Sequence, residues 1–247
     1  MRIIYNNIID GATITSYSEN PQYLFDDAFK DSRLSRVGRT VGHDTEWIKF
    51  TLPSAAAATY ILIFGHNLTA GATVKLEGNA TDVWTSPSFS ETLTVIDIIN
   101  KNFTSASYKY WRLTIADASN PDGYIQISKV IIGTYLQMPG FNRVFAMPRK
   151  STSKGDKSPS GQLYGDKRII FTSAEFKFNG VSQANKVLID AFFDIVETIK
   201  PFVLLVWENS LTTQVPIYCN LTDDLNWAME DSSGLSWSFT LPVEQCF

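Results

Sequence analysis

The feature that most limits how this chain can fold is a series of short segments in which apolar and polar residues alternate. Between Glu46 and Met138 these segments read "EWIKFTL", "TYILIFG", "TVKLEG", "TLTVIDI", "YKYWRLTIA" and "YIQISKVIIGTYLQM", with turn sequences such as "LTAGA", "EGNATD" and "SNPDG" between them. A period of two residues is typical of half-buried β-strands. Evenly spaced strands without intervening helices favour a β-sandwich over repeated strand–helix–strand units. Residues 1–138 are therefore predicted to form an N-terminal β-sandwich.

The pattern changes in residues 139–247. A strand is expected in "RIIFTSAEFKFNG", and apolar residues then recur at three- and four-residue steps from Val187 to Ile199, with Pro201 as a stop signal. Three more strand candidates follow: "FVLLVWEN", "VPIYCNLTDDLNWAMED" and "LSWSFTLPVEQCF". This order predicts a small α+β domain with one main helix on a sheet. The fold class is therefore mainly β.

The segment at about 149–167 interrupts the second domain. Its centre, Ser151 to Gly161, is rich in Ser, Lys, Gly and Pro and contains no apolar residue. Such a segment cannot bury itself, so we expect a long, exposed loop. The loop has almost no aromatic side chains that would stack on bases, which disfavours nucleic acid as a partner.

Composition excludes several classes of function. The chain has 247 residues, of which 44% are hydrophobic and 19% are charged, as in a globular protein with a core. No apolar run approaches the roughly 18 residues of a membrane span, and the N-terminus lacks a cleavage site for secretion, so we expect synthesis in the cytoplasm without a signal peptide. The two His and two Cys residues leave little room for a zinc centre or a His-based triad, and no nucleophile elbow or phosphate loop is present. The chain is therefore not expected to be an enzyme. Whether Cys219 and Cys246 pair is left open.

Three carboxylates and three arginines are concentrated in "NPQYLFDDAFKDSRLSRVGRT", from Asn20 to Thr40. The carboxylates Asp26, Asp27 and Asp31 lack the spacing of the twelve-residue calcium loop. Two interpretations stay open: the carboxylates pair with nearby arginines, or they hold a structural cation such as calcium together with backbone carbonyls.

The N-terminal half resembles the discoidin-like, galactose-binding jelly rolls. The resemblance rests on "IIDGATITSYSENPQYLFDDAFKDSRLSRVGRT", on "FGHNL" and on "YWRLTI" followed by "IQISKVIIG". One departure is "VGRT", which replaces the usual Trp after the opening segment. The resemblance implies a carbohydrate-binding module whose opening segment wraps one end of the sandwich near the ligand loops. Since glycans need aromatic faces flanked by polar donors, the candidate ligand residues are Tyr17, Tyr23, Arg36, Arg39 and His43.

The C-terminal half is similar to small α+β domains of long-tailed bacteriophage tail and baseplate proteins, including distal tail proteins. The matching pieces are Arg143, the helix from Val187 to Ile199, "PFVLLVWENS" and "WSFTLPVEQCF". The resemblance implies a virion protein of the tail or baseplate that forms a ring-like homo-oligomer, contacts other tail proteins and attaches to host-surface glycan. The alternative is a free carbohydrate-binding or adhesion protein.

Two features predict where subunits would meet. The helix has apolar residues on more than one face, with Phe192 and Phe193 adjacent and Ile189 expected to face away from Phe192, which predicts a partner surface at Phe193. The exposed loop is basic at Lys150, Lys154 and Lys157, whereas the rest of the domain is acidic, so opposite charges would favour head-to-tail association. A solvated loop without a partner is the other interpretation.

Overall fold

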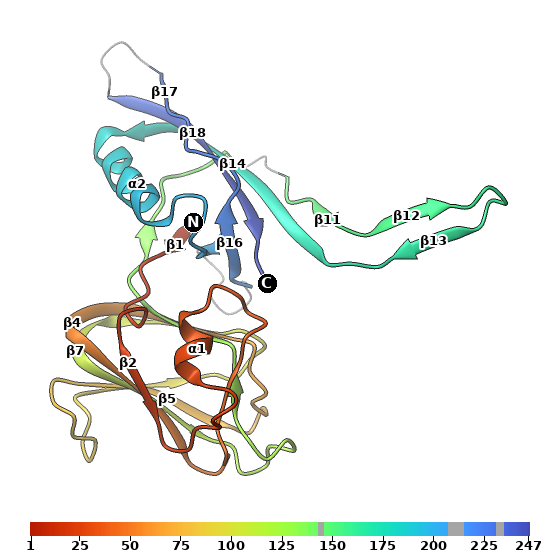
Figure 1. Ribbon diagram of the computed structural model, residues 1–247. Helices are drawn as coiled ribbons and strands as arrows, with labels where there is room; N and C mark the ends of the chain where they lie inside the picture. Colours follow the sequence, from red (N-terminus) through yellow and green to blue (C-terminus); the bar gives the residue numbers. More distant parts are fainter. Residues whose placement is uncertain (143–145, 207–214, 231–234) are drawn as a thin grey trace. The chain divides into compact units, whose positions relative to one another are not determined.

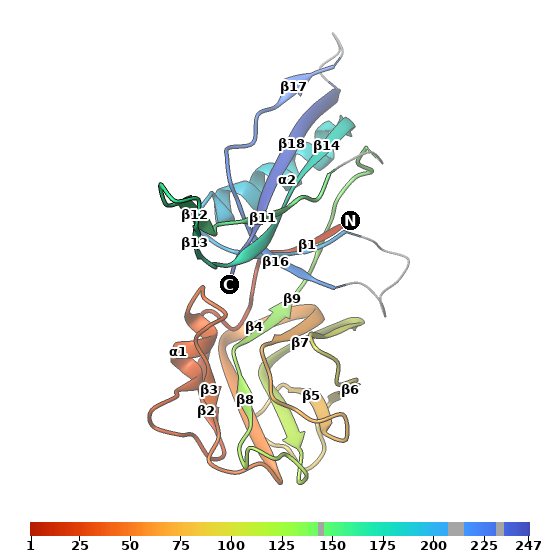
Figure 2. The same ribbon diagram turned by 90° about the vertical axis from the view of Figure 1, so that its right-hand side faces the viewer.

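The computed structural model describes residues 1–142, 146–206, 215–230 and 235–247. The chain forms two compact units. Unit 1 contains Met1–Tyr5 and most of the chain from Gln137 onward, and unit 2 contains Asn6–Leu136 (Figures 1 and 2). The first five residues, which the sequence places in the N-terminal domain, thus belong with the C-terminal part of the chain.

Unit 2 is built on one antiparallel sheet in the order β2-β4-β7-β5-β6, with β9 also paired to β4. A separate two-stranded ladder joins β3 to β8. The strands are β2 (Thr13–Ser16), β3 (Gly38–Arg39), β4 (Glu46–Phe64), β5 (Thr73–Asn79), β6 (Phe89–Leu93), β7 (Ile99–Ala116), β8 (Gln126–Ile127) and β9 (Lys129–Gly133).

Two segments expected as separate strands, "EWIKFTL" and "TYILIFG", form the single strand β4. The pairing of β4 with β7 continues through register shifts between Thr51 and Ala56 and between Ala58 and Tyr60. Bulges of this kind bend a strand while its ladder continues on both sides. One long strand can therefore replace two short ones.

The core of unit 2 surrounds Trp111, which is fully buried. The rings of Phe89 and Tyr108 pack edge-on against its indole at 5.6 and 5.7 Å, and the indole nitrogen donates to the carbonyl oxygen of Tyr108 at 3.2 Å. The buried members of β4 and β7 alternate with exposed ones, as the period-two pattern predicts.

A short helix, α1 (Phe25–Lys30), was not predicted from the sequence. It buries Phe25, Ala28 and Phe29, and its start is fixed because a side-chain oxygen of Glu19 accepts a hydrogen bond from the backbone nitrogen of Phe25 at 2.8 Å. Gly38 lies against this helix, and a Cβ there would come within 2.2 Å of the Phe25 ring. Glycine at this position therefore lets β3 approach α1.

Unit 1 contains an eight-stranded sheet in the order β10-β1-β15-β16-β18-β14-β11, with β17 on the edge of β18. Its strands are β1 (Arg2–Ile4), β10 (Leu136–Gln137), β11 (Arg149–Ser151), β14 (Ile170–Ser182), β15 (Phe202–Leu205), β16 (Ile217–Leu221), β17 (Ala228–Met229) and β18 (Ser236–Gln245). β1 pairs antiparallel with β15, with Ile3 opposite Leu204. The pairing explains why the first residues belong to unit 1.

The main helix, α2 (Gln183–Val196), packs on this sheet (Figure 2). Its N-terminus is capped by Ser182, whose hydroxyl oxygen accepts from the backbone nitrogen of Asn185 at 3.3 Å. Ile189, Phe192 and Val196 are its buried residues. The expectation that Ile189 faces away from Phe192 is therefore wrong, because residues three apart lie on the same side of a helix.

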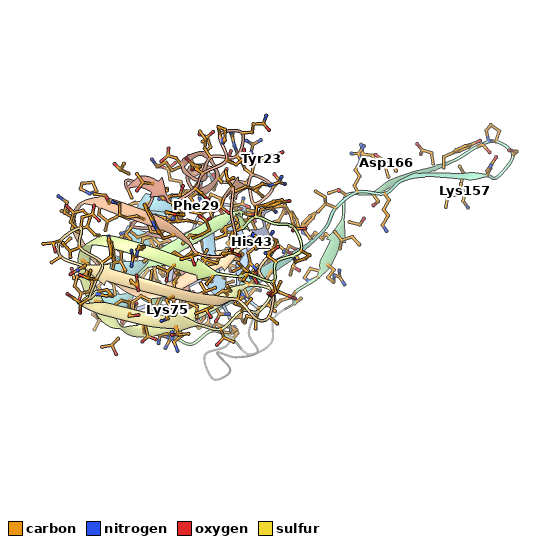
Figure 3. All side chains as sticks on the ribbon, turned by 90° about the horizontal axis from the view of Figure 1, so that it is seen from below. Tyr23, Phe29, His43, Lys75, Lys157 and Asp166 are labelled. Carbon is orange, nitrogen blue, oxygen red and sulfur yellow. The ribbon has the colours of Figure 1, made fainter. Side chains whose placement is uncertain are left out.

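The segment at 149–167, expected to be a loop, is a β-hairpin. β12 (Lys154–Lys157) pairs with β13 (Leu163–Asp166), and Lys154 lies opposite Asp166. β11 pairs with β14, so that the hairpin continues from the sheet as a projection, here called the arm (residues 149–170) (Figures 1 and 3). The prediction missed this because paired strands satisfy their backbone groups without any apolar alternation.

The prediction of a mainly β chain with antiparallel sheets and one main helix is confirmed. Arg143 and the end of "PFVLLVWENS" lie outside the described residues. In the part of the chain that the structure describes, no helix has the length and apolar character needed to cross a membrane.

Candidate ligand site in unit 2

A small cavity opens beside α1 and the segment that leads to β3. Its volume is about 240 Å³, and it is lined by Gln22, Tyr23, Leu24, Asp27, Ser35, Arg36 and Val37. Two of the candidate ligand residues, Tyr23 and Arg36, thus line the same cavity. The volume is below the range of roughly 300–1,000 Å³ that is usual for sites of drug-sized ligands, so the cavity suits one small group such as a single sugar ring.

Arg39 of β3 lies between two tyrosine rings. Its guanidinium carbon is 4.1 Å from the ring centroid of Tyr23 and 4.8 Å from that of Tyr124. The Nε atom donates to Oε1 of Gln126 at 2.9 Å, directly across the β3–β8 ladder. We call Tyr23, Arg39 and Tyr124 the Tyr–Arg–Tyr stack. It presents a cation and two aromatic rings together.

The "FGHNL" segment, residues 64–68, holds the β8 side of this stack in place through hydrogen bonds of Asn67. Asn67 accepts from the backbone nitrogen of Gln126 at 2.8 Å through its side-chain oxygen, and its amide donates to the carbonyl oxygen of Tyr124 at 2.9 Å. Gly65 has a positive φ of 58°, and a Cβ there would lie 2.2 Å from the hydroxyl of Ser128. The segment thus positions Tyr124 and Gln126, the second of which is in β8.

Sequence reasoning missed Tyr124 and Gln126. A signal was available, because "NPDG" is a turn sequence and residues two apart in the following strand point to the same side. Nothing in the sequence showed that this side meets β3.

The acidic residues near α1 pair with basic ones. Oδ1 of Asp26 is 2.6 Å from Nζ of Lys30, and Oδ2 of Asp27 is 3.1 Å from Arg36. Asp31 binds Arg33 at 2.7 Å, and the hydrogen bond from that side chain holds the pKa of Asp31 far below its usual range. The ion-pairing interpretation therefore describes Asp26, Asp27 and Asp31 in this structure.

The cation interpretation has less support from the geometry. Among the described residues, no group of three or more His, Cys, Asp and Glu side chains converges in a way that would hold a metal ion. A buried ammonium is present instead: Lys129 donates to the carbonyl oxygens of Phe29 and, at 2.8 Å, of Asp31. Calcium binding at Asp26, Asp27 and Asp31 stays an untested alternative.

Tyr17 and His43 take part in other contacts. Tyr17 is 66% exposed, and its ring lies 6.2 Å from that of Trp47. Nε2 of His43 is 3.5 Å from a carboxylate oxygen of Asp44, and its carbonyl oxygen accepts from the backbone nitrogen of Asp117. The five candidate ligand residues are thus divided among separate contacts. Tyr23 stacks on Arg39 and lines a cavity with Arg36, whereas Tyr17 lies near Trp47 and His43 near Asp44.

In the described part of unit 2, three carboxylates are buried: Glu46, Asp117, and Glu77, which accepts from the side chain of Arg112 at 2.7 Å. Burial raises the pKa of Glu46, whose Oε1 accepts from the Ser18 hydroxyl at 2.7 Å while Oε2 has no hydrogen-bond partner among the described residues. Burial also acts to raise the pKa of Asp117, but hydrogen bonds from the backbone and hydroxyl of Thr69 outweigh it and lower that pKa. Asp117 is thus a structural acceptor that holds the loop before β5.

Unit 1 has a larger cavity of about 620 Å³ beside the base of the arm. Its lining includes Pro148, Lys150, Glu175, Lys177 and Val243. Apolar and charged side chains both contribute, so the cavity offers a mixed surface to a partner.

The two cysteines of unit 1 are free. Cys219 lies opposite Gln245 in the β16–β18 ladder, and Cys246 follows Gln245 in the chain. The thiol of Cys246 donates to the side-chain oxygen of Asn220 at 2.9 Å. Burial raises the pKa of the Cys246 thiol to about 11 and that of Cys219 well above its ordinary value. Both residues are therefore poor nucleophiles at neutral pH.

No protein-family model matches the chain, and no curated protein matches it by sequence. Solved structures align with about half of it. A Streptococcus pneumoniae fucose binding module is 11% identical, with 52% of this chain and 95% of that chain covered and a TM-score of 0.43. The Clostridium perfringens protein CpGH89CBM32-5, in complex with GalNAc-β-1,3-galactose, is 14% identical over 52% of this chain and 99% of that chain, with a TM-score of 0.42. A chitosan-binding module from a Paenibacillus chitosanase/glucanase is 16% identical over 52% of this chain and 98% of that chain, with a TM-score of 0.41. At this level of similarity, the function of this chain has to be inferred from its own side chains.

Proposed function

We propose that this chain is a self-assembling structural protein that carries a glycan-binding module, and that its assembly is the tail tip or baseplate of a bacteriophage. The observation that carries the proposal is the arm of unit 1. In residues 149–170, Ser158 is the one residue that is not exposed. The exposed apolar side chains on the arm are Leu163, Tyr164, Ile169 and Ile170.

Such an arm has little reason to be stable without a partner. An isolated two-stranded hairpin is marginal in water, and stability usually needs a third strand or a packed face. Exposed apolar side chains on a projection mark an interaction surface. A second copy of the chain is the occupant we propose, because a head-to-tail contact repeated around a ring gives every arm a partner.

Charge supports this choice of partner. The arm carries Lys150, Lys154 and Lys157, whereas the residues from Phe178 onward are strongly acidic. Opposite charges on the two sides of a head-to-tail contact would steer association and fix its register.

Helix α2 supplies a second candidate contact. Val187, Leu188 and Ile195 of α2 and Ile199 just after it are exposed, while Ile189, Phe192 and Val196 cover the sheet. Phe193, the residue predicted to form the interface, is half-buried. The apolar excess on the outer side of α2 is therefore better represented by Leu188 and Ile195, which are 51% and 46% exposed.

The assignment to a phage tail rests on the sequence resemblance of residues 139–247. The resembling pieces described by the structure correspond to α2, β15 and β18. Copies of a tail protein would present unit 2 at the particle surface, where a glycan-binding module serves attachment to a host.

A free glycan-binding protein is the second candidate function. The Tyr–Arg–Tyr stack and the adjoining cavity favour it, because two aromatic rings and a charged donor lie beside a hollow of about 240 Å³ that suits a single sugar ring. This candidate needs unit 2 alone and gives the arm no role.

Proteolysis of the arm tests the assembly proposal. We expect cleavage near Lys154 and Lys157 in dilute protein at high salt, and protection when the protein is concentrated at low salt, since the charge contribution to assembly is screened beyond roughly 8 Å at physiological ionic strength. Equal cleavage under both conditions would leave the arm without a partner and favour the second candidate.

A panel of immobilised bacterial surface glycans tests the binding proposal. We expect Tyr23→Ala and Tyr124→Ala to lose at least tenfold in affinity for any glycan that the protein binds. Tyr110→Ala is the control, since Tyr110 lies on β7 and outside the stack. Equal effects of all three substitutions would place the glycan elsewhere.

A further inference from the structure

We infer that the glycan bound at the Tyr–Arg–Tyr stack is acidic and presents a carboxylate, phosphate or sulfate group to Arg39. This inference rests on the proposed glycan binding of unit 2. It names the class of glycan, which the fold of unit 2 leaves undetermined.

The first step is the charge balance around α1. Each carboxylate there already faces a basic partner: Asp26 pairs with Lys30, Asp27 with Arg36, and Asp31 with Arg33. Arg39 is the basic residue of this segment that remains. Its side-chain hydrogen bond goes to the neutral amide of Gln126, and no ion pair among the described residues includes it.

The second step is the geometry of the unpaired guanidinium. Nε is the one guanidinium nitrogen of Arg39 that donates to a protein acceptor in the described part of the chain, so the two terminal nitrogens of the side chain are available. Arginine stays charged at any relevant pH, and its planar fork matches carboxylate and phosphate oxygens in pairs. A ligand with such a group would complete the hydrogen bonding of Arg39.

A second stacked arginine in the same unit shows what a structural role looks like. Arg112 lies 4.4 Å from the ring centroid of Trp84, but its Nε and Nη2 both donate to Oε2 of Glu77, at 2.8 and 2.7 Å. Its charge is therefore balanced within the fold. Arg39 has the same kind of aromatic contact but no carboxylate partner. We assign the position of that missing carboxylate to an acidic group of the ligand.

The third step is access. Arg39 is half-buried, and Tyr23, which stacks on it, also lines the 240 Å³ cavity with Gln22 and Ser35. Two flanking rings hold the guanidinium in one orientation, and their apolar faces weaken competition from water. A sugar ring against Tyr23 could thus place an acidic substituent at Arg39.

The experiment compares matched oligosaccharides that differ in one group. Galacturonate oligosaccharides, galactose oligosaccharides of equal length, and 6-phosphorylated and 6-sulfated forms of the latter are titrated against the full chain by calorimetry. We expect at least one acidic form to bind tenfold or more tightly than the neutral form. The preference among carboxylate, phosphate and sulfate then identifies the source of the charge.

Two variants locate the effect. Arg39→Gln should remove the preference for the acidic form while the affinity for the neutral form changes less than threefold. Arg33→Gln is the control: it removes the same charge from a guanidinium that is already paired with Asp31 and lies outside the cavity lining. Retention of the native melting temperature shows that Arg39→Gln is folded. If this variant does not fold, the comparison of acidic and neutral sugars with the wild type still tests the inference.

The outcomes separate this inference from the proposed function. Equal affinity of the wild type for acidic and neutral sugars, with binding lost in Tyr23→Ala, would overturn the acidic class and leave glycan binding intact. Acidic preference that falls equally in Arg39→Gln and Arg33→Gln would show a diffuse charge effect and also overturn it. No binding of any glycan by the wild type would overturn both.

Discussion

The ammonium nitrogen of Lys129 lies 2.8 Å from the carbonyl oxygen of Asp31, and the Lys129 side chain is buried in unit 2. The same nitrogen donates to the carbonyl oxygen of Phe29. These carbonyls belong to the C-terminal end of α1, where helices leave acceptors without intrahelical partners. Lys129 on β9 thus caps the C-terminal end of α1 and places a cation at the negative end of the helix dipole.

Lys129→Met should destabilise unit 2 by about 2–3 kcal/mol, because buried carbonyl groups that lose their donor cost about 1–3 kcal/mol each. Lys30→Met is the control. Lys30 pairs with Asp26 at the surface of the same helix, and such pairs contribute about 0.3–0.5 kcal/mol. Urea unfolding measures both, and similar losses in the two variants would contradict the role given to Lys129.

Calcium should not change the melting temperature of the wild type, because the ammonium of Lys129 already occupies the carbonyl acceptors beside Asp31. The measurement is thermal unfolding in excess calcium and in excess chelator. A calcium-dependent increase would show that Asp26, Asp27 and Asp31 rearrange into a metal site, as one interpretation of the sequence predicts.

Glu46 should make unit 2 less stable as the pH rises. Burial raises its pKa in the folded state above the ordinary 4.5, so between the unfolded and folded pKa values the folded state binds more protons and loses stability with increasing pH. Glu46→Gln removes this titration. The difference in unfolding free energy between Glu46→Gln and wild type should therefore grow in favour of the variant from pH 4 to pH 7, and a constant difference would argue against the assigned pKa direction.

Glu197→Gly should stabilise unit 1 by roughly 1 kcal/mol. Glu197 follows α2 with a φ of 46°, and it is the one non-glycine residue with positive φ in the described part of the chain. Glycine adopts this conformation without the steric cost of a Cβ. Glu197→Ala keeps the Cβ and serves as the control, so an equal gain in both variants would assign the effect to the lost carboxylate.

The strands of unit 2 were predictable because alternation is a local signal. In the "YKYWRLTIA" segment, the alternation of apolar and polar residues alone indicates which side is buried, and Trp111 and Leu113 are indeed buried. The helix α2 could be predicted in the same way, from apolar residues at three- and four-residue steps. The pairing of β1 with β15 was not predictable, since Ile3 and Leu204 meet across almost the whole chain.

The candidate site was only half predictable for the same reason. Tyr23 and Arg39 lie close in the sequence and were both proposed, whereas Tyr124 and Gln126 reach them through the β3–β8 ladder. The arm escaped prediction because its strands show no alternation of apolar and polar residues. The predicted strands were recognised by that alternation.

Assembly through the arm is best tested by the molar masses of the full chain and of an arm-shortened variant, both measured by light scattering. In the variant, residues 153–168 are replaced by Asn-Gly, a two-residue turn that joins Thr152 to Ile169, whose backbones already share a hydrogen bond at 3.2 Å. Assembly through the arm predicts an integer multiple of the chain mass for the wild type and a folded monomer for the variant, with glycan binding by unit 2 retained. A monomeric wild type, or an oligomer that survives shortening of the arm, would contradict assembly through the arm.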